Sequence, residues 1–463
     1  MCGCLAKRAT FPQPPRSFMS QDLNRLPPQT KYIVGNEASE RLSFYAMRAM
    51  LTLFIARELF PAHPKGDALA ESIYHYFNMA IYFLPLVGAW IADRWWGRYR
   101  TILWVSLGYC VGHGLLAASE FAGTLEARRA IFFSGLICIA IGAGGIKPCV
   151  SAFVGDQFTG GREHLLPKIY SLFYWSINFG SFFGVALIPK VRDHFGYAWA
   201  FGIPGIFMGL ATLVFWLGRK TYTKKPPTGE QAPASPEQVA EDRRTIGRIL
   251  ILFAPIMVFW SLFDQTGSTW VQQGEKMTQY TIGWLWGYQI DAESIQSLNP
   301  LLVMVLIPIC SKGIYPLLAW CGIEPTPLRR MGAGMIFAAL SFVAAAWLQQ
   351  RVDAGNHLSI LWQLLPYTVL TIGEVFLSIT GLEFAFRQAP ARLKSTIMSC
   401  WYLSVAFGNL LAGTVAQVNA NLVGGSPAMK MLFYAGLMLV VAGIFAVIAV
   451  RFPTREKQEA SVA

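Results

Sequence analysis

Charged and polar side chains occupy one face of an apolar stretch near the start of the chain. They are Glu37, Glu40, Arg41, Tyr45 and Arg48, at offsets of 3, 4, 8 and 11 residues from the first. This spacing places them on one face of a helix. Because a charged stripe cannot face lipid, we expect it to line a wet cavity or to pair with other helices. The alternative is a helix that lies on the membrane surface.

A second apolar stretch carries His75, Asn78 and Tyr82, again on one helical face. Imidazole titrates near neutral pH, so His75 is a candidate for carrying a proton. The alternative is a structural histidine that packs against neighbouring side chains or caps a helix.

Further along, Lys147 sits between Gly145 and Pro148 in an apolar stretch, and a buried ammonium needs an anion from the protein or from a substrate. A purely structural ion pair is the alternative for Lys147.

Two acidic side chains stand in the second half of the chain. Asp264 shares a helical face with Trp260, Phe263, Gly267 and Ser268. Glu374 and Ser378 are one turn apart, whereas Glu383 is nine residues from Glu374 and faces the opposite side. We therefore expect functional roles for Asp264 and Glu374 and a structural role for Glu383.

Two asparagines, Asn178 and Asn299, lie in Gly- and Pro-bearing stretches of apolar segments, where they bind a ligand or bridge helices. The sequence contains no GxxxxGK[ST], GxSxG or HExxH motif and no zinc-spaced cluster. We therefore expect neither an enzyme nor direct drive by ATP, and neither a cofactor nor a metal.

The composition indicates what must position these residues. Of 463 residues, 54 % are hydrophobic and 14 % charged, against about 25 % charged in soluble domains. This excludes a soluble enzyme and a disordered chain. We predict an all-α membrane protein with twelve transmembrane helices, at 36–57, 70–93, 100–120, 129–154, 168–189, 198–217, 249–272, 294–320, 329–350, 359–386, 395–417 and 430–450.

The net charge of +12 does not indicate a nucleic-acid groove, because Lys and Arg cluster in alternate loops. With both termini in the cytoplasm, the inner loops hold about three times as many Lys and Arg as the outer loops. Most of the eight cysteines are expected to fill apolar space, and modification of Cys2 and Cys4 is left open. The polar, Pro-rich first 30 residues do not predict a cleaved signal peptide.

A Pro-rich stretch divides the chain into halves. We predict a cytoplasmic tail, a six-helix bundle, a cytoplasmic linker, a second six-helix bundle and a tail, at 1–35, 36–217, 218–248, 249–450 and 451–463. The prolines of the linker prevent a long helix there. Two such bundles around a substrate site near the midplane form a common transporter plan.

Several long blocks resemble the proton-dependent oligopeptide transporters, the POT/PTR2 family of the major facilitator superfamily. Residues 37–45 are similar to the family motif ExxERFxYY, with Leu42 and Phe44 in place of its phenylalanine and first tyrosine. Further family-like blocks stand at 88–102, 144–158, 173–181, 259–268 and 373–390. The block IYHYF with His75 is similar to the mammalian peptide transporters, although 351–358 leaves no room for their large outer domain. The linker likewise has no room for the two additional helices of many bacterial members.

The resemblance implies a proton-coupled symporter of di- and tripeptides. Arg41 and Lys147 would hold the peptide carboxylate and Glu374 the ammonium, with Asn178 and Asn299 near that ammonium or the peptide backbone. Peptide side chains would rest against Tyr45, Tyr82, Trp260, Ser378 and Trp401. The alternatives are a family member for another solute, such as nitrate, which the negative charge of Glu374 would repel, and a non-transporting peptide sensor.

Span directions place two gates. We expect a pair of His75 and Asp264, with Arg48 nearby, to help close the outer side, and a pair of Lys147 and Glu374 to close the inner side. Proton coupling is expected at Glu37, Glu40, His75 and Asp264, with the carrier left open because such sites titrate as a unit. The other expected partners are the proton gradient and the lipid bilayer. We expect a multi-pass protein of the bacterial inner membrane that functions as a monomer.

Overall fold

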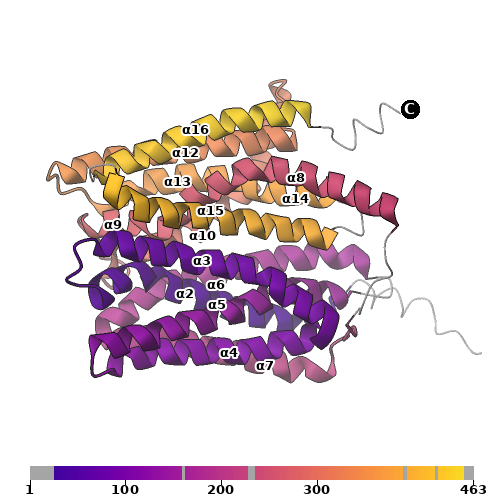
Figure 1. The fold of residues 1–463 in the computed structure, drawn as a ribbon, viewed down its shortest axis with the longest axis horizontal. Helices are drawn as coiled ribbons and strands as arrows, with labels where there is room; N and C mark the ends of the chain where they lie inside the picture. The colour runs from indigo at the N-terminus through magenta and orange to yellow at the C-terminus, as the bar shows by residue number, and fades with distance from the viewer. Residues whose placement is uncertain (1–24, 159–161, 228–234, 389–393, 423–425, 453–463) are drawn as a thin grey trace, which may run out of the picture.

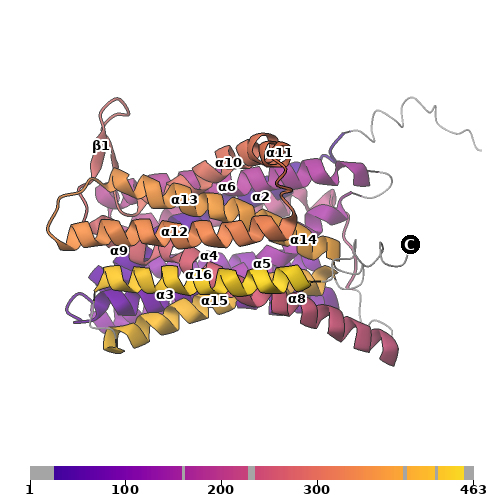
Figure 2. The same ribbon diagram turned by 90° about the horizontal axis from the view of Figure 1, so that it is seen from above.

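A computed structural model describes residues 25–158, 162–227, 235–388, 394–422 and 426–452. The described chain is almost entirely helical, and its long helices run roughly side by side (Figures 1 and 2). The first half contains α2 (Thr30–Phe54), α3 (Gly66–Ile91), α4 (Arg98–Ala118), α5 (Leu125–Asp156), α6 (Leu166–Phe195) and α7 (Tyr197–Leu217).

The second half is more interrupted. Its helices are α8 (Pro236–Phe263), α9 (Thr269–Glu275), α10 (Leu298–Ile309), α11 (Tyr315–Trp320), α12 (Pro327–Asp353), α13 (Leu364–Glu374), α14 (Thr380–Gln388), α15 (Lys394–Leu422) and α16 (Pro427–Arg451). A short antiparallel hairpin of β1 (Tyr280–Ile282) and β2 (Tyr288–Ile290) pairs Thr281 with Gln289. Wider π-helical turns continue α2, α3, α10 and α13 at Ile55–Leu59, Ala92–Trp96, Cys310–Ile314 and Val375–Ile379.

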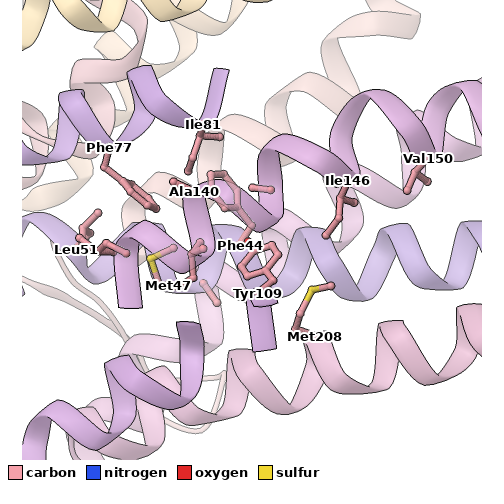
Figure 3. Close-up of a cluster of buried hydrophobic side chains, with 14 of the residues drawn as sticks. Phe44, Met47, Leu51, Phe77, Ile81, Tyr109, Ala140, Ile146, Val150 and Met208 are labelled. Carbon is pink, nitrogen blue, oxygen red and sulfur yellow. The ribbon is translucent and has the colours of Figure 1, made fainter. Parts of the chain in front are cut away.

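Each half has its own apolar core. One buried cluster draws its residues from 33–222 and the other from 249–452. Figure 3 shows part of the first, where Phe44 and Met47 of α2, Phe77 of α3 and Tyr109 of α4 pack together. Tyr82 packs against both clusters, so it marks the surface on which the halves meet.

Each of the twelve predicted spans coincides with one or two helices, which confirms the predicted fold class. Ten helical stretches of the described residues are long and apolar enough to cross a membrane. The helices α2 and α3 are not among the ten. The stripes of polar and charged residues along these two helices lower their hydropathy, so the helices that look least like membrane spans carry the candidate chemistry.

The predicted linker is shorter in the structure, because α8 begins at Pro236 and not near residue 249. Ser235 and Gln238 form a capping box, and Pro236 suits the first helical position because it has no N–H to leave unpaired. The preceding residues run against the first half: Lys225 Nζ lies 2.8 Å from Asp156 Oδ1, and Tyr222 is buried.

The two ends of the molecule are distinguished by these features. We call the end that carries the β1–β2 hairpin the hairpin end, and the opposite end, where α8 begins, the linker end (Figure 2). That the linker end faces the cytoplasm stays a prediction from the loop charges.

The close contact between α4 and α5 allows the helix packing of the first half to be tested by substitution. A Cβ on Gly112 would lie 2.8 Å from the carbonyl oxygen of Gly135, whereas a Cβ on Gly108 would meet nothing within 4 Å. We expect Gly112→Ala to lower stability by about 1–3 kcal/mol through overpacking. Gly108→Ala should leave stability unchanged or raise it by up to about 1 kcal/mol. Thermal midpoints of the purified variants measure both changes, and equal midpoints would contradict the packing.

Candidate functional site

The charged stripe of α2 is buried and internally paired. Arg41 Nε lies 2.8 Å from Glu37 Oε1 and 2.6 Å from Glu40 Oε2, and all three side chains are almost inaccessible. One guanidinium thus holds two carboxylates. The group therefore carries one excess negative charge when both carboxylates are ionised, and any rival anion at Arg41 would leave a carboxylate uncompensated.

Lys147 has a different environment. Its ammonium lies 4.2 Å from the ring centre of Tyr82 and 4.7 Å from that of Phe44. Within the described residues, no carboxylate oxygen comes within 4.0 Å of it, although the side chain is only 9 % exposed. The helix α5 continues through Pro148, so the lysine is held on a regular helix. The aromatic faces stabilise the cation partly, and an anion would stabilise it further.

Glu374 lies at the end of α13, just before the π-helical turn Val375–Ile379. Asn299 Nδ2 donates a 2.7 Å hydrogen bond to Glu374 Oε2 and lies 3.2 Å from Thr371 Oγ1. The predicted pair of Lys147 and Glu374 is therefore not formed in this conformation. Its two members stand on different halves, one against aromatic rings and the other with an amide.

The predicted direct pair of His75 and Asp264 is also absent, and an asparagine stands between them. Asp264 forms a buried ion pair with Arg48 of α2 and accepts a 2.6 Å hydrogen bond from Asn409 Nδ2. His75 Nδ1 lies 2.9 Å from Asn409 Oδ1, and its Nε2 lies 3.0 Å from Ser268 Oγ. His75 and Asp264 are therefore linked through Asn409 of α15.

Sequence reasoning missed Asn409. The signal was available, because an asparagine in an apolar span is the same signal that selected Asn178 and Asn299. The sequence does not show which helices are neighbours in space. In the structure α15 lies beside α3, although the two helices are more than 300 residues apart in the chain (Figure 1).

The hydrogen bonds around His75 indicate which of its two ring nitrogens carries the proton. The amide nitrogen of Asn409 donates to Asp264 and to the Val405 carbonyl, so its oxygen accepts. His75 Nδ1 must then donate, and Nε2 accepts from the Ser268 hydroxyl. The structure thus suits a neutral imidazole. A second proton would arrive at Nε2 and would force the Ser268 hydroxyl to turn, so protonation of His75 disturbs the contact between the halves.

Further polar contacts join the two halves at the hairpin end. Thr52 donates a 2.6 Å hydrogen bond to the Gly267 carbonyl, and Arg57 Nη2 lies 2.6 Å from Glu275 Oε2. Lys190 Nζ lies 2.7 Å from Asp291 Oδ2. Arg192 also pairs with Glu293, and Tyr288 of the hairpin donates to the Ala186 carbonyl at 2.7 Å. These contacts therefore hold the two halves together at the hairpin end.

The remaining predicted residues lie around this centre. Asn178 donates to the Tyr174 carbonyl at 3.0 Å and so bonds within its own helix. Tyr82 stacks with Tyr402 at 6.4 Å between ring centres, across the two halves. Trp260 and Trp401 form an edge-to-face pair at 6.1 Å. Tyr45 packs against Phe44, and Ser378 is half-buried in the π-helical turn of α13.

Within the described residues, no group of three or more His, Cys, Asp or Glu side chains has an arrangement that would hold a metal ion. The polar centre therefore consists of fixed charges of both signs: Lys147 and the α2 stripe on the first half, Glu374 with Asn299 on the second. Such an arrangement can bind a molecule that carries a charge at each end.

Comparison with known proteins gives the family. Residues 99–239 and 231–430 match the sequence profile of the POT family. The chain belongs to the POT family. This confirms the resemblance seen in the sequence, and it places the chain in a family of transporters.

Relatives and solved structures agree with this assignment. The chain is 36 % identical to mouse solute carrier family 15 member 2 over 414 residues, which cover 80 % of this chain and 56 % of the mouse protein. It is 35 % identical to peptide transporter family 1 of Drosophila melanogaster over 370 residues, which cover 72 % of this chain and 49 % of the fly protein. The chain thus spans about half the length of the curated relatives it matches.

The fold is similar to that of solved POT family transporters. The crystal structure of an auto-inhibited POT family peptide transporter superposes with a TM-score of 0.85 at 37 % identity, covering 92 % of this chain and 98 % of that one. The structure of PepTSo gives a TM-score of 0.83 at 38 % identity, covering 92 % of this chain and 99 % of that one.

The contribution of the buried ion pair of Arg48 and Asp264 to stability can be compared with that of an exposed ion pair. Arg48→Met leaves the Asp264 carboxylate buried without its cation, which costs about 3–5 kcal/mol. Arg57→Gln breaks the exposed pair with Glu275 and should cost below about 1 kcal/mol. The double variant Arg48→Met/Asp264→Asn should recover most of the loss of thermal midpoint. A double variant no more stable than Arg48→Met alone would contradict the pairing.

Proposed function

We propose that this POT family member is a proton-coupled symporter of di- and tripeptides that works by alternating access. The observation that carries the proposal is the buried ammonium of Lys147, which has no carboxylate partner among the described residues, on the half opposite Glu374. Relatives named as peptide transporters support the same substrate class.

The two ends of a peptide have matching charges in this site. The peptide carboxylate would bind Lys147 and Arg41, and would supply the anion that a buried ammonium requires. The peptide ammonium would bind Glu374, beside Asn299, with Asn178 near the same end or the backbone. The middle of the peptide would face Tyr45, Tyr82, Trp260, Ser378 and Trp401. Recognition of the ends alone accounts for tolerance of many side chains.

The α2 stripe supplies a link between peptide and proton. Arg41 neutralises only one of the two carboxylates of Glu37 and Glu40. If a peptide carboxylate draws on Arg41, a buried carboxylate loses its cation and takes up a proton. His75 and Asp264 form a second proton-sensitive group near the hairpin end. The proton gradient is the energy source, and we propose no cofactor or metal.

The arrangement of the gates supports alternating access. The hairpin end is clasped by the network of Arg48, Asp264, Asn409 and His75, while the proposed linker-end pair of Lys147 and Glu374 is apart. We propose that the two closures alternate, so that this conformation is closed toward the outside. The proposal includes cytoplasmic termini, a bacterial inner-membrane location and function as a monomer, within the domain limits 36–217 and 249–450.

Uptake of labelled dialanine into proteoliposomes tests the proposal. The wild-type protein should accumulate dialanine under an inward proton gradient and lose the accumulation when a protonophore is added. Glu374→Gln and Lys147→Ala should each lower the initial rate at least tenfold, because each leaves one end of the peptide without its counter-charge. Glu324→Gln, a change in an exposed loop, is the control and should keep the wild-type rate.

Other outcomes separate the alternatives. Dialanine flux that ignores the gradient would contradict the proton coupling but keep the substrate. No dialanine flux through an intact protein would contradict peptide transport and favour another solute or a sensor, which uptake of nitrate and binding of peptide would then distinguish.

A further inference from the structure

The protein has a further buried carboxylate, outside the candidate functional site. Glu71 lies on α3 and is only 2 % exposed. Its Oε2 pairs with the ammonium of Lys430, at the start of α16. Its other oxygen, Oε1, is buried and has no hydrogen-bond partner within the described residues. An unpartnered buried carboxylate oxygen is costly, so its retention points to a function.

Glu71 borders a cavity at the hairpin end. The cavity holds about 480 Å³ and lies between the two halves; its charged lining includes Arg57, His63, Asp67, Glu71, Lys276 and Lys430. His63 and Asp67 are exposed or half-exposed on the hairpin-end surface. Water from that side therefore reaches the neighbourhood of the Glu71 carboxyl.

The cavity leads to the buried network. His75 follows Glu71 by four residues on α3, so the two side chains lie on the same helical face, one turn apart. From His75 the hydrogen bonds continue through Asn409 to Asp264 and then to Arg48. Hydrogen bonds and an ion pair therefore connect His75 with Asp264 and Arg48, and Glu71 stands at the cavity one helical turn from His75.

We propose that Glu71 is the group that takes up the proton from the hairpin-end solution and passes it to His75. A proton from water binds Oε1 of Glu71 and neutralises the carboxylate. It then moves to Nε2 of His75, which becomes an imidazolium, while Glu71 returns to its charged form. This role rests on the proposed proton-coupled transport and adds the residue that first receives the proton.

Lys430 couples this step to the opening of the hairpin end. Glu71 stands on the first half and Lys430 on the second, so separation of the halves removes the ammonium from the carboxylate. Without Lys430 nearby, the Glu71 carboxylate has lost the counter-ion with which it pairs in this structure. When the halves close, the returning ammonium favours the carboxylate and drives the proton onward. Lys430 is thus a positioning residue that sets the direction of transfer.

The other charged groups around Glu71 are compatible with this role. Its own helix contributes Asp67 one turn before and His75 one turn after. The helix α16 contributes Lys430 and the buried Tyr434, whose hydroxyl has no described partner. The cavity lining also includes Arg57 and Lys276, with His63 and Lys65 in the loop before α3, and Arg57 pairs with Glu275. Arg57 pairs with Asp67 and Glu275, whereas Lys430 pairs with Glu71.

Three variants test the proposal in proteoliposomes. Glu71→Gln keeps the size of the side chain but cannot bind a proton. Lys430→Gln breaks the same ion pair but keeps the carboxylate. Glu71→His restores a titratable group. Each is assayed for gradient-driven accumulation of dialanine against external pH, and for dialanine counterflow without a gradient, which does not require net proton movement. Monodisperse protein with a normal thermal midpoint is the condition for comparison.

We expect Glu71→Gln to slow gradient-driven uptake at least tenfold while counterflow changes less than twofold. Lys430→Gln should slow gradient-driven uptake less than Glu71→Gln does, because it keeps the proton acceptor and removes only the cation that drives the proton onward. Glu71→His should recover part of the uptake lost in Glu71→Gln, with a shifted pH profile. Glu71→Gln with wild-type uptake and pH profile would overturn the proposal. Equal losses for Glu71→Gln and Lys430→Gln in both assays would overturn it in favour of a simple latch. Wild-type protein without gradient-driven uptake would instead contradict the proposed proton coupling itself.

Discussion

A charge inside an apolar helical bundle must have a partner, and this constraint organises the protein. Desolvating an ion costs several kcal/mol, which only an opposite charge or a set of hydrogen bonds offsets. Arg48 therefore holds Asp264, and Arg41 holds Glu37 and Glu40. Because Arg48 and Asp264 stand on different halves, satisfying the charges also fixes how the halves meet. Within the described part of the chain, Lys147 has no carboxylate within 4.0 Å, and we propose that a substrate anion binds there.

The helices could be predicted from the sequence because apolar length and helical periodicity can be read within each segment of the chain. Apolar length predicts the spans, and helical periodicity predicts which side chains share one face of α2 and of α3. The predicted span begins near residue 249 because the linker prolines indicate a break in the helix, whereas α8 begins at Pro236, behind the capping box at Ser235. A proline at the first turn of a helix begins it rather than prevents it.

The contacts between halves could not be predicted in the same way. Charge and span direction brought His75, Asp264 and Arg48 to one end, but only the packing of α15 beside α3 places Asn409 between two of them. The predicted pair of Lys147 and Glu374 is not formed in this structure, and its role in closing the linker end stays a proposal. The residue types thus predict which charged and polar groups can pair. The arrangement of the two halves in a given conformation determines which of these pairs are formed.

Distances between spin labels in proteoliposomes test the central claim most directly. One label pair at the hairpin end, at positions 126 and 356, and one at the linker end, at positions 100 and 324, report both closures; all four positions are exposed. We predict that Asp264→Asn lengthens the hairpin-end distance and shortens the linker-end distance in the same sample. A hairpin-end distance that stays unchanged in this variant would contradict the claim that the buried network holds that end closed.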